Sequence, residues 1–216
     1  MSITLIIIII TVLVSITAFS NDKVFNDFIF DPPAVTYNKQ WYRFLTCGLI
    51  HANYAHLAFN MYAFYMFGES VERSFIQVFH EKGKLLYLVL YITSLFACLV
   101  PTYLKHRTNN NYRSLGASGA ISAVIFAYIV LNPLQKIGLI FLPEQWGLPA
   151  FVFGLLYLVI SSFMDRRGGS GINHSAHIFG ALYGIAFLFV TSYFLSDYHV
   201  LEEFMQKVQA FASRFS

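Results

Sequence analysis

The sequence predicts an all-α membrane protein, a bundle of six transmembrane helices with a long first loop that is partly embedded in the membrane. Of its 216 residues, 57% are hydrophobic and 12% are charged, whereas a soluble domain carries roughly a quarter charged residues. The apolar residues gather into six runs, each close to the roughly 20 residues that cross a bilayer core. All 11 Asp and Glu residues lie outside these runs. We therefore expect a single membrane domain over residues 1–216.

The predicted spans cover residues 2–19, 51–67, 85–104, 115–131, 147–164 and 176–195. No Lys or Arg precedes the first run and no small-residue cleavage site follows it, so we expect a retained helix rather than a cleaved signal peptide. With the N-terminus inside, six Lys and Arg residues would face the cytoplasm and eight would face outward. This weak bias toward the opposite orientation leaves the orientation undecided from charge alone.

Two segments outside the runs are also apolar. The connection 20–50 is rich in Phe, Tyr and Ile, so we expect it to fold against the bundle edge and the lipid headgroup zone. The tail 197–216 places apolar side chains three and four positions apart, among them Leu201, Phe204 and Phe215. This periodicity predicts an amphipathic helix that lies on the membrane.

The charged and metal-binding residue types exclude several classes of function. The net charge is +3 and the 14 Lys and Arg residues form no basic block, which argues against a nucleic acid partner. Cys47 and Cys98 are too few for a disulfide framework. His174 and His177 are three residues apart, but no H-E-x-x-H motif or carboxylate base accompanies them, so a hydrolytic zinc site is disfavoured. A transporter would show inverted repeats or ionisable relays in mid-membrane, and the sequence has neither.

The fourth run opens with a serine between glycines. Ser118 follows Gly116 and precedes Gly119. The start of a helix presents unpaired backbone N–H groups and the positive end of the helix dipole, which together stabilise negative charge. An oxyanion formed beside Ser118 would therefore be stabilised there.

The sixth run provides a matching histidine. Gly180 and Gly184 are four residues apart, a spacing that lets two helices approach closely, and His177 lies beside this stripe. If the connections alternate sides, the starts of the fourth and sixth runs share one membrane face, so Ser118 and His177 can meet. A neutral imidazole can take the serine proton during nucleophilic attack. Because no acidic residue lies at membrane depth, we predict a Ser-His dyad rather than a triad.

The second run adds two candidate oxyanion donors. His56 and Asn60 are four residues apart, so they lie on one helical face. Both can donate hydrogen bonds to a developing oxyanion. Read singly, each feature also has a structural explanation, because membrane serines bond carbonyls and Gly-x-x-x-Gly spacing packs helices. The co-location of independent elements favours catalysis.

Taken together, these motifs resemble the rhomboid intramembrane serine proteases, in the family's order and over nearly the whole chain. The matching motifs are W-x-R (Trp41, Arg43), H-x4-H-x3-N (His51, His56, Asn60), Glu-Arg (Glu72, Arg73), G-x-S-G (Gly116, Ser118, Gly119) and A-H-x2-G-x3-G (Ala176, His177, Gly180, Gly184).

The resemblance implies that Ser118 is the nucleophile and His177 its general base. It also implies that the oxyanion is held by His56, Asn60 and the backbone N–H of Ser118. Residues implied to be structural near the site are His51 and Arg43, which would bond the first loop, Glu72 and Arg73, which would brace the loop after the second span, and Gly116, Gly119, Gly180 and Gly184.

The implied reaction is hydrolysis of a peptide bond in or near the transmembrane segment of another protein, without metal or cofactor. The resemblance further implies that both chain ends lie in the cytoplasm and that the site opens toward the outer face, and we expect a bacterial cytoplasmic (inner) membrane.

One position departs from the family pattern. Four residues after the serine, the family usually has an aromatic residue that stacks on the histidine, whereas this chain has Ser122. We expect His177 to be held less firmly, or to be held by a hydrogen bond from Ser122. The alternative function is a catalytically inactive, rhomboid-like protein that binds membrane clients.

Overall fold

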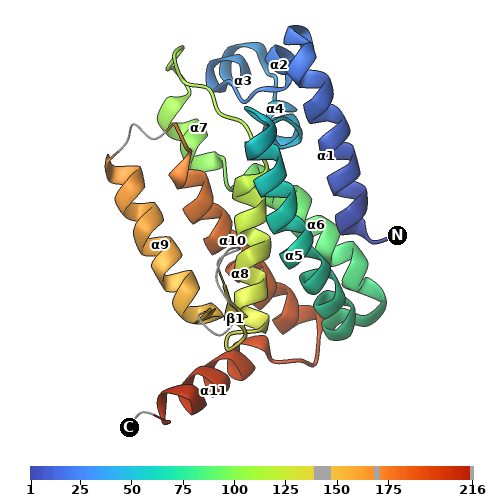
Figure 1. Cartoon of the computed structure of the whole chain (residues 1–216), viewed down its shortest axis with the longest axis vertical. Coiled ribbons are helices and arrows are strands. Elements are labelled where there is room, and N and C mark those ends of the chain that lie inside the picture. The colour runs from blue at the N-terminus through green and yellow to red at the C-terminus, as the bar shows by residue number, and fades with distance from the viewer. Residues whose placement is uncertain (139–146, 168–170, 215–216) are drawn as a thin grey trace.

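The protein folds into a bundle of helices, shown in Figure 1. This computed structural model describes residues 1–138, 147–167 and 171–214. Within those ranges, three helical stretches are long and apolar enough to cross a membrane, namely Ile3–Ser20, Tyr54–His106 and His174–Leu195, and Ser118–Leu131 is a shorter apolar helix. The chain is therefore mostly helical, with apolar helices of membrane-spanning length.

The long helices follow the apolar runs of the sequence. They are α1 (Ile3–Ser20), α5 (Tyr54–Phe79), α6 (Gly83–Ala97), α8 (Ser118–Leu131), α9 (Ala150–Arg167) and α10 (His174–Leu195). The shorter helices are α2 (Asp22–Phe28), α3 (Pro32–Asn38), α4 (Arg43–Thr46), α7 (Val100–His106) and α11 (Val200–Ala212), with single 3₁₀ turns η1 (Cys47–Leu49) and η2 (His80–Lys82).

Several helix boundaries differ from the expected ones, for local reasons. The helix of the second run continues past residue 67 to Phe79, through the more polar segment that follows the run. The third run is interrupted between α6 and α7, where Pro101 occupies the first turn of α7; proline fits a helix start but not its interior. The fourth helix begins at Ser118 rather than 115, since Gly116 has a φ of 106° that a helix excludes.

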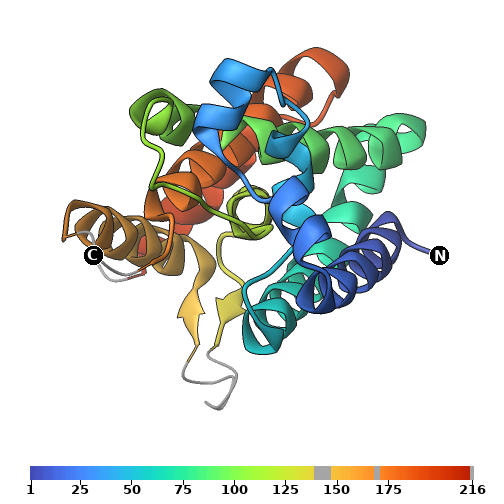
Figure 2. The same ribbon diagram turned by 90° about the horizontal axis from the view of Figure 1, so that it is seen from above.

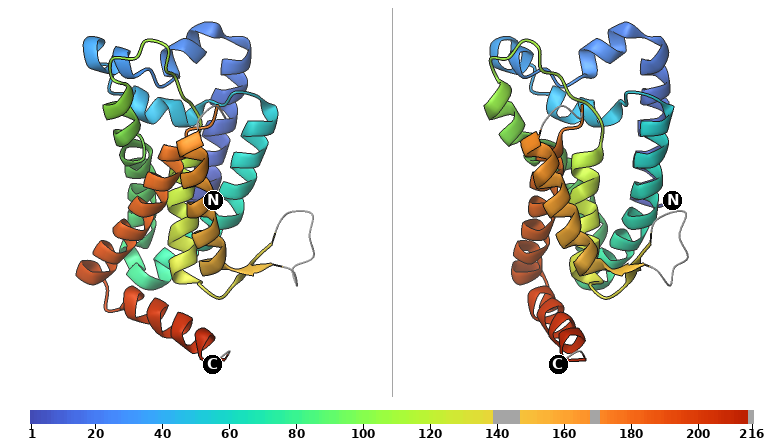
Figure 3. Two further views of the ribbon diagram at one scale, coloured as in Figure 1. Left: turned by 90° about the vertical axis from the view of Figure 1, so that its left-hand side faces the viewer. Right: turned by 60° about the vertical axis from the view of Figure 1, so that its left-hand side comes forward.

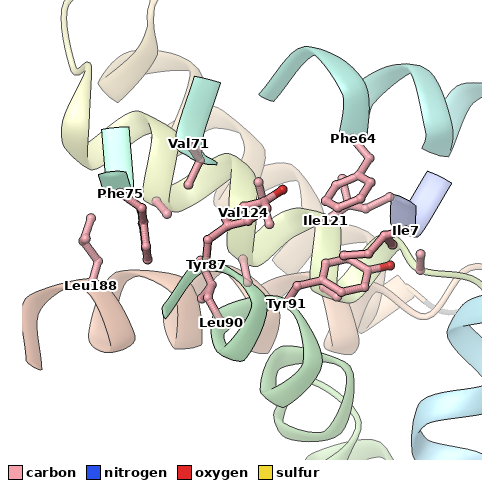
Figure 4. Close-up of a cluster of buried hydrophobic side chains, with 14 of the residues drawn as sticks. Ile7, Phe64, Val71, Phe75, Tyr87, Leu90, Tyr91, Ile121, Val124 and Leu188 are labelled. Atoms are coloured by element: carbon pink, nitrogen blue, oxygen red, sulfur yellow. The ribbon is translucent and has the colours of Figure 1, made fainter. Parts of the chain in front are cut away.

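Helix α8 lies in the middle of the bundle, as seen from above in Figure 2. It contacts α5, α6, α9, α10 and α11. Its composition of Ala, Ile, Val and Phe leaves it apolar on all sides, as expected for a helix enclosed by others. The main core forms around it from side chains that include Phe64, Phe75, Tyr87, Tyr91, Ile121, Val124 and Leu188 (Figure 4).

The first connection is not an irregular loop. It forms α2, α3, α4 and η1, and its buried residues Phe30, Val35 and Phe44 pack with Leu99 next to α7. Arg43 holds the segment together, because its Nη1 donates to the carbonyl oxygens of Asn26 at 2.8 Å and Ile29 at 2.7 Å.

The opposite end of the bundle carries α11, which lies away from α2 and α3 in both views of Figure 3. This helix begins at Val200 and packs on α10 and α8. Leu201 and Met205 remain exposed on it, whereas Val200 is buried. Phe215 lies outside the described residues. A short antiparallel pair, β1 (Lys136–Ile137) and β2 (Leu148–Pro149), precedes α9 with Ile137 opposite Leu148.

Glu72 has a different role from the one expected. Its buried carboxylate accepts the backbone N–H groups of Ile3 at 2.9 Å and Thr4 at 3.0 Å, and the Thr4 hydroxyl at 2.9 Å. It therefore binds the N-terminus of α1, where the helix dipole favours an anion, and not the loop after α5. Arg73 is largely exposed and lies 3.6 Å from Glu69 in an i,i+4 pair.

We predict that Glu72→Ala lowers the free energy of unfolding by about 2–3 kcal/mol, because the backbone N–H groups of Ile3 and Thr4 lose the charged acceptor that they bond. Thermal or denaturant unfolding in detergent measures this loss. The matched control is Arg73→Ala, which removes a surface ion pair and should change stability by less than about 0.5 kcal/mol. Equal losses in the two variants would contradict the assigned role of Glu72.

Candidate active site

Ser118 and His177 are hydrogen-bonded to each other. The Nε2 of His177 lies 2.7 Å from the Oγ of Ser118, although the two residues are 59 positions apart in the chain. Ser118 is the first residue of α8, and His177 lies in the first turn of α10. Both helices begin at the end of the bundle that carries α2 and α3 (Figures 1 and 3).

Close backbone contact between α8 and α10 brings the two side chains together. A Cβ atom on Gly180 would lie 2.0 Å from the carbonyl oxygen of Gly119, and one on Gly184 would lie 2.2 Å from that of Ala123. Only glycine allows this approach. The spacing of small residues therefore sets the distance between the helices, and with it the distance between Ser118 and His177.

The loop before Ser118 is fixed to the first connection. The backbone N–H of Gly116 donates to the carbonyl of Cys47 at 2.9 Å. Phe30 and Ser114 form a two-way backbone bridge at 3.0 and 3.1 Å. These contacts hold the start of α8 against η1 and the segment before α3.

The start of α10 is held separately. The side chain of Asn173 caps this helix by accepting the N–H of Ala176 at 3.0 Å. It also exchanges hydrogen bonds with Thr102 of α7, at 3.1 and 3.2 Å. Both helix starts are thus tied to neighbouring elements.

His56 and Asn60 lie beside Gly116. A Cβ atom on Gly116 would be 2.9 Å from Cε1 of His56 and 3.8 Å from Nδ2 of Asn60. Asn60 is buried, and its Nδ2 has no hydrogen-bond partner among the described residues. An unpaired buried donor costs free energy. This amide is therefore available to an acceptor that enters next to Ser118.

His51 and Arg43 bond α1 and the first connection. The Nδ1 of His51 is 3.0 Å from the hydroxyl of Ser15 on α1, which itself donates to the carbonyl of Leu49 at 2.8 Å. His51 thus links the start of α5 to α1, and its ring meets that of His56 edge-on at 4.9 Å. Arg43 bonds the first connection, as described above.

Ser122 does not bond His177. Its Oγ lies 2.9 Å from the carbonyl of Ser118 and 2.7 Å from the hydroxyl of Tyr157 on α9. The Tyr157 ring stacks on the His177 ring, with centroids 6.3 Å apart and planes at 28°. Sequence reasoning missed Tyr157, because residue spacing within the fifth run does not reveal which neighbouring helix a side chain faces.

A small cavity borders Ser118. It has a volume of about 20 Å³ and its lining includes Cys47, Cys98, Ser118, Gly119 and Asn173. This is enough space for about one water molecule. Across the part of the chain that the structure describes, His, Cys, Asp and Glu side chains form no group of three that could hold a metal ion.

Comparison with known proteins identifies the family of this chain. Residues 38–194 match the family model of the Rhomboid domain. The chain belongs to the rhomboid family. It is 30% identical over 155 residues to YdcA of Bacillus subtilis, an inferred rhomboid protease, covering 71% of this chain and 68% of YdcA. It is 27% identical over 158 residues to the rhomboid protease GlpG of Haemophilus influenzae, covering 72% of each protein.

Other members of the family are organellar. Rhomboid-like protein 11 of Arabidopsis thaliana, a chloroplastic protein, is 31% identical over 171 residues, which cover 72% of this chain and 54% of that protein. The match thus spans about half of this longer relative. Rhomboid membership supports a protease-like hydrolase function within a membrane.

Proposed function

We propose that this rhomboid-family protein is an intramembrane serine endopeptidase that cleaves transmembrane segments of other proteins. Ser118 is the nucleophile and His177 the general base. The observation that carries the proposal is the 2.7 Å contact between Nε2 and Oγ, the distance at which a base takes a proton from the attacking group.

The reaction proceeds in two halves. The Ser118 hydroxyl gives its proton to His177 as its oxygen attacks the scissile carbonyl, and the resulting imidazolium then protonates the leaving amine. Water subsequently attacks the acyl-enzyme with His177 again as base, which releases the acid product and restores the serine. The backbone N–H of Ser118 and the side chains of His56 and Asn60 stabilise the oxyanion in both halves.

The fold supports a six-span arrangement of α1, α5, α6 with α7, α8, α9 and α10. Leu155, Val159 and Phe163 of α9 and Phe194 of α10 are exposed apolar side chains, which lipid would cover. We propose that the first connection lies partly in the membrane on the same side as Ser118. Two of the relatives are bacterial, and we propose a bacterial cytoplasmic membrane for this protein, with both chain ends inside and the site toward the outer face, as the resemblance to rhomboid proteases implies. A periplasm-specific phosphatase fused to the C-terminus should then be inactive.

Asn60→Ala should lower kcat by about 10²–10³-fold, because it removes one oxyanion donor. Stability should hardly change, since Nδ2 has no partner to lose among the described residues. Steady-state cleavage together with the unfolding temperature tests both statements. A variant that keeps full activity would exclude Asn60 as an oxyanion donor.

The function is tested by reconstituting the purified protein in lipid vesicles with a tagged transmembrane substrate. The proposal predicts cleavage in or next to the transmembrane segment, located by mass spectrometry and unaffected by a chelator. Substrate binding without cleavage would instead favour the inactive, client-binding alternative. Activity that chelator abolishes would favour the metal alternative.

A further inference from the structure

We infer that Tyr157 is the positioning residue that holds the His177 imidazole against Ser118, which gives α9 a direct part in assembling the catalytic dyad. This inference rests on the proposed function. Tyr157 does not touch the reacting atoms; it acts through His177.

The imidazole needs such support because little else fixes it. Among the described residues, the only hydrogen bond of the His177 side chain is the one to Ser118. No carboxylate from the described part of the chain contacts the other ring nitrogen of His177, Nδ1. The ring is bounded instead by two rings, Tyr157 stacked at 6.3 Å and His174 edge-on at 5.8 Å. Of these two, only Tyr157 presents a nearly parallel face, which limits tilting of the imidazole.

Tyr157 is itself fixed in place. Because Ser122 has one hydroxyl proton and directs it to the Ser118 carbonyl at 2.9 Å, the 2.7 Å bond between Ser122 and Tyr157 takes its proton from the tyrosine. Phe126 and Phe153 flank the tyrosine ring at 5.6 and 6.3 Å. One side chain of α9 thus bonds the helix that carries the nucleophile and stacks on the base.

The small residue at position 122 and the large one at 157 form a reciprocal pair. The Tyr157 hydroxyl lies 2.7 Å from the Ser122 side chain, so an aromatic residue at 122 would occupy the space that Tyr157 fills. In this chain the aromatic neighbour of the histidine therefore comes from α9 and not from α8. The departure at Ser122 is accounted for by this exchange.

The test compares Tyr157→Leu with Tyr183→Leu, since Tyr183 is a tyrosine that bonds Thr93 at 2.7 Å on the α6 side of α10. Tyr157→Leu should lower kcat about 10–100-fold, as expected for a displaced catalytic group, with KM changed less than about threefold. The rate of fluorophosphonate labelling of Ser118 should fall in parallel. Tyr183→Leu should leave kcat within about threefold even where it lowers the unfolding temperature. Equal kcat in Tyr157→Leu and wild type would overturn the inference.

Two milder variants keep the test decisive if Tyr157→Leu does not fold. Tyr157→Phe and Ser122→Ala both remove the hydrogen bond between these two side chains, and Ser122→Ala also removes the bond to the Ser118 carbonyl. Tyr157→Phe should reduce kcat by about fivefold, Ser122→Ala by at least as much, and the double variant should be no worse than Ser122→Ala. Additive losses would overturn the inference.

Moving the aromatic residue gives a further check. The double variant Tyr157→Ala with Ser122→Phe should have a kcat at least tenfold higher than that of Tyr157→Ala alone. No recovery would overturn the inference. A wild-type protein that neither labels nor cleaves would instead refute the proposed function, and this inference with it.

Discussion

His177→Ala is expected to reduce cleavage of a transmembrane substrate by about 10⁴-fold or more, because the Ser118 hydroxyl then has no base within reach. Ser118→Ala should lose a similar factor, and the double variant should be no worse than either single one, since the two groups act as a unit. Substrate KM and the unfolding temperature should change little. Initial rates of cleavage in reconstituted vesicles measure these losses.

The matched control is His174→Ala. This neighbouring histidine lies one turn before His177, with the two ring centroids 5.8 Å apart, but it is not bonded to Ser118. We expect its removal to cost no more than about tenfold in rate. A loss in His174→Ala as large as in His177→Ala, or wild-type cleavage by Ser118→Ala, would contradict the assignment.

Gly180→Ala is expected to be the most damaging single-methyl change in the bundle. The added Cβ would lie 2.0 Å from the carbonyl oxygen of Gly119, and a backbone atom cannot swing aside as a flexible side chain can. We predict a loss of about 3 kcal/mol in stability from overpacking. Because α8 and α10 must separate, Ser118 and His177 separate too, and cleavage should fall with stability.

Gly138→Ala is the control for this change, since no atom lies within 4 Å of the added Cβ. It should alter stability by less than about 0.5 kcal/mol. Unfolding temperatures and cleavage rates of both variants in the same detergent provide the comparison. A stable, fully active Gly180→Ala protein would mean that the helix contact does not set the dyad distance.

Local patterns predicted much of this architecture. The six apolar runs each contain a helix, because hydrophobic length is visible in the sequence. His56 and Asn60 share a helical face and both lie beside Gly116, as a four-residue spacing requires. Gly180 and Gly184 are also four residues apart and share one helical face, and this face contacts α8.

Long-range contacts were harder to predict. The partner of Glu72 is the N-terminus of α1, which lies about 68 positions away in the chain, so no spacing rule reveals it. Tyr157 reaches His177 from another helix, and its role depends on how α9 is rotated in the bundle. The break between α6 and α7 was marked by Pro101 but lay inside a continuous apolar run.

Labelling with a fluorophosphonate probe tests the central claim most directly, because the probe reacts only with a serine that a base has activated. We predict that the wild-type protein is labelled on Ser118, as mapped by peptide mass spectrometry, and that Ser118→Ala and His177→Ala remain at background. Equal labelling of all three proteins, or a label on another residue, would contradict the account.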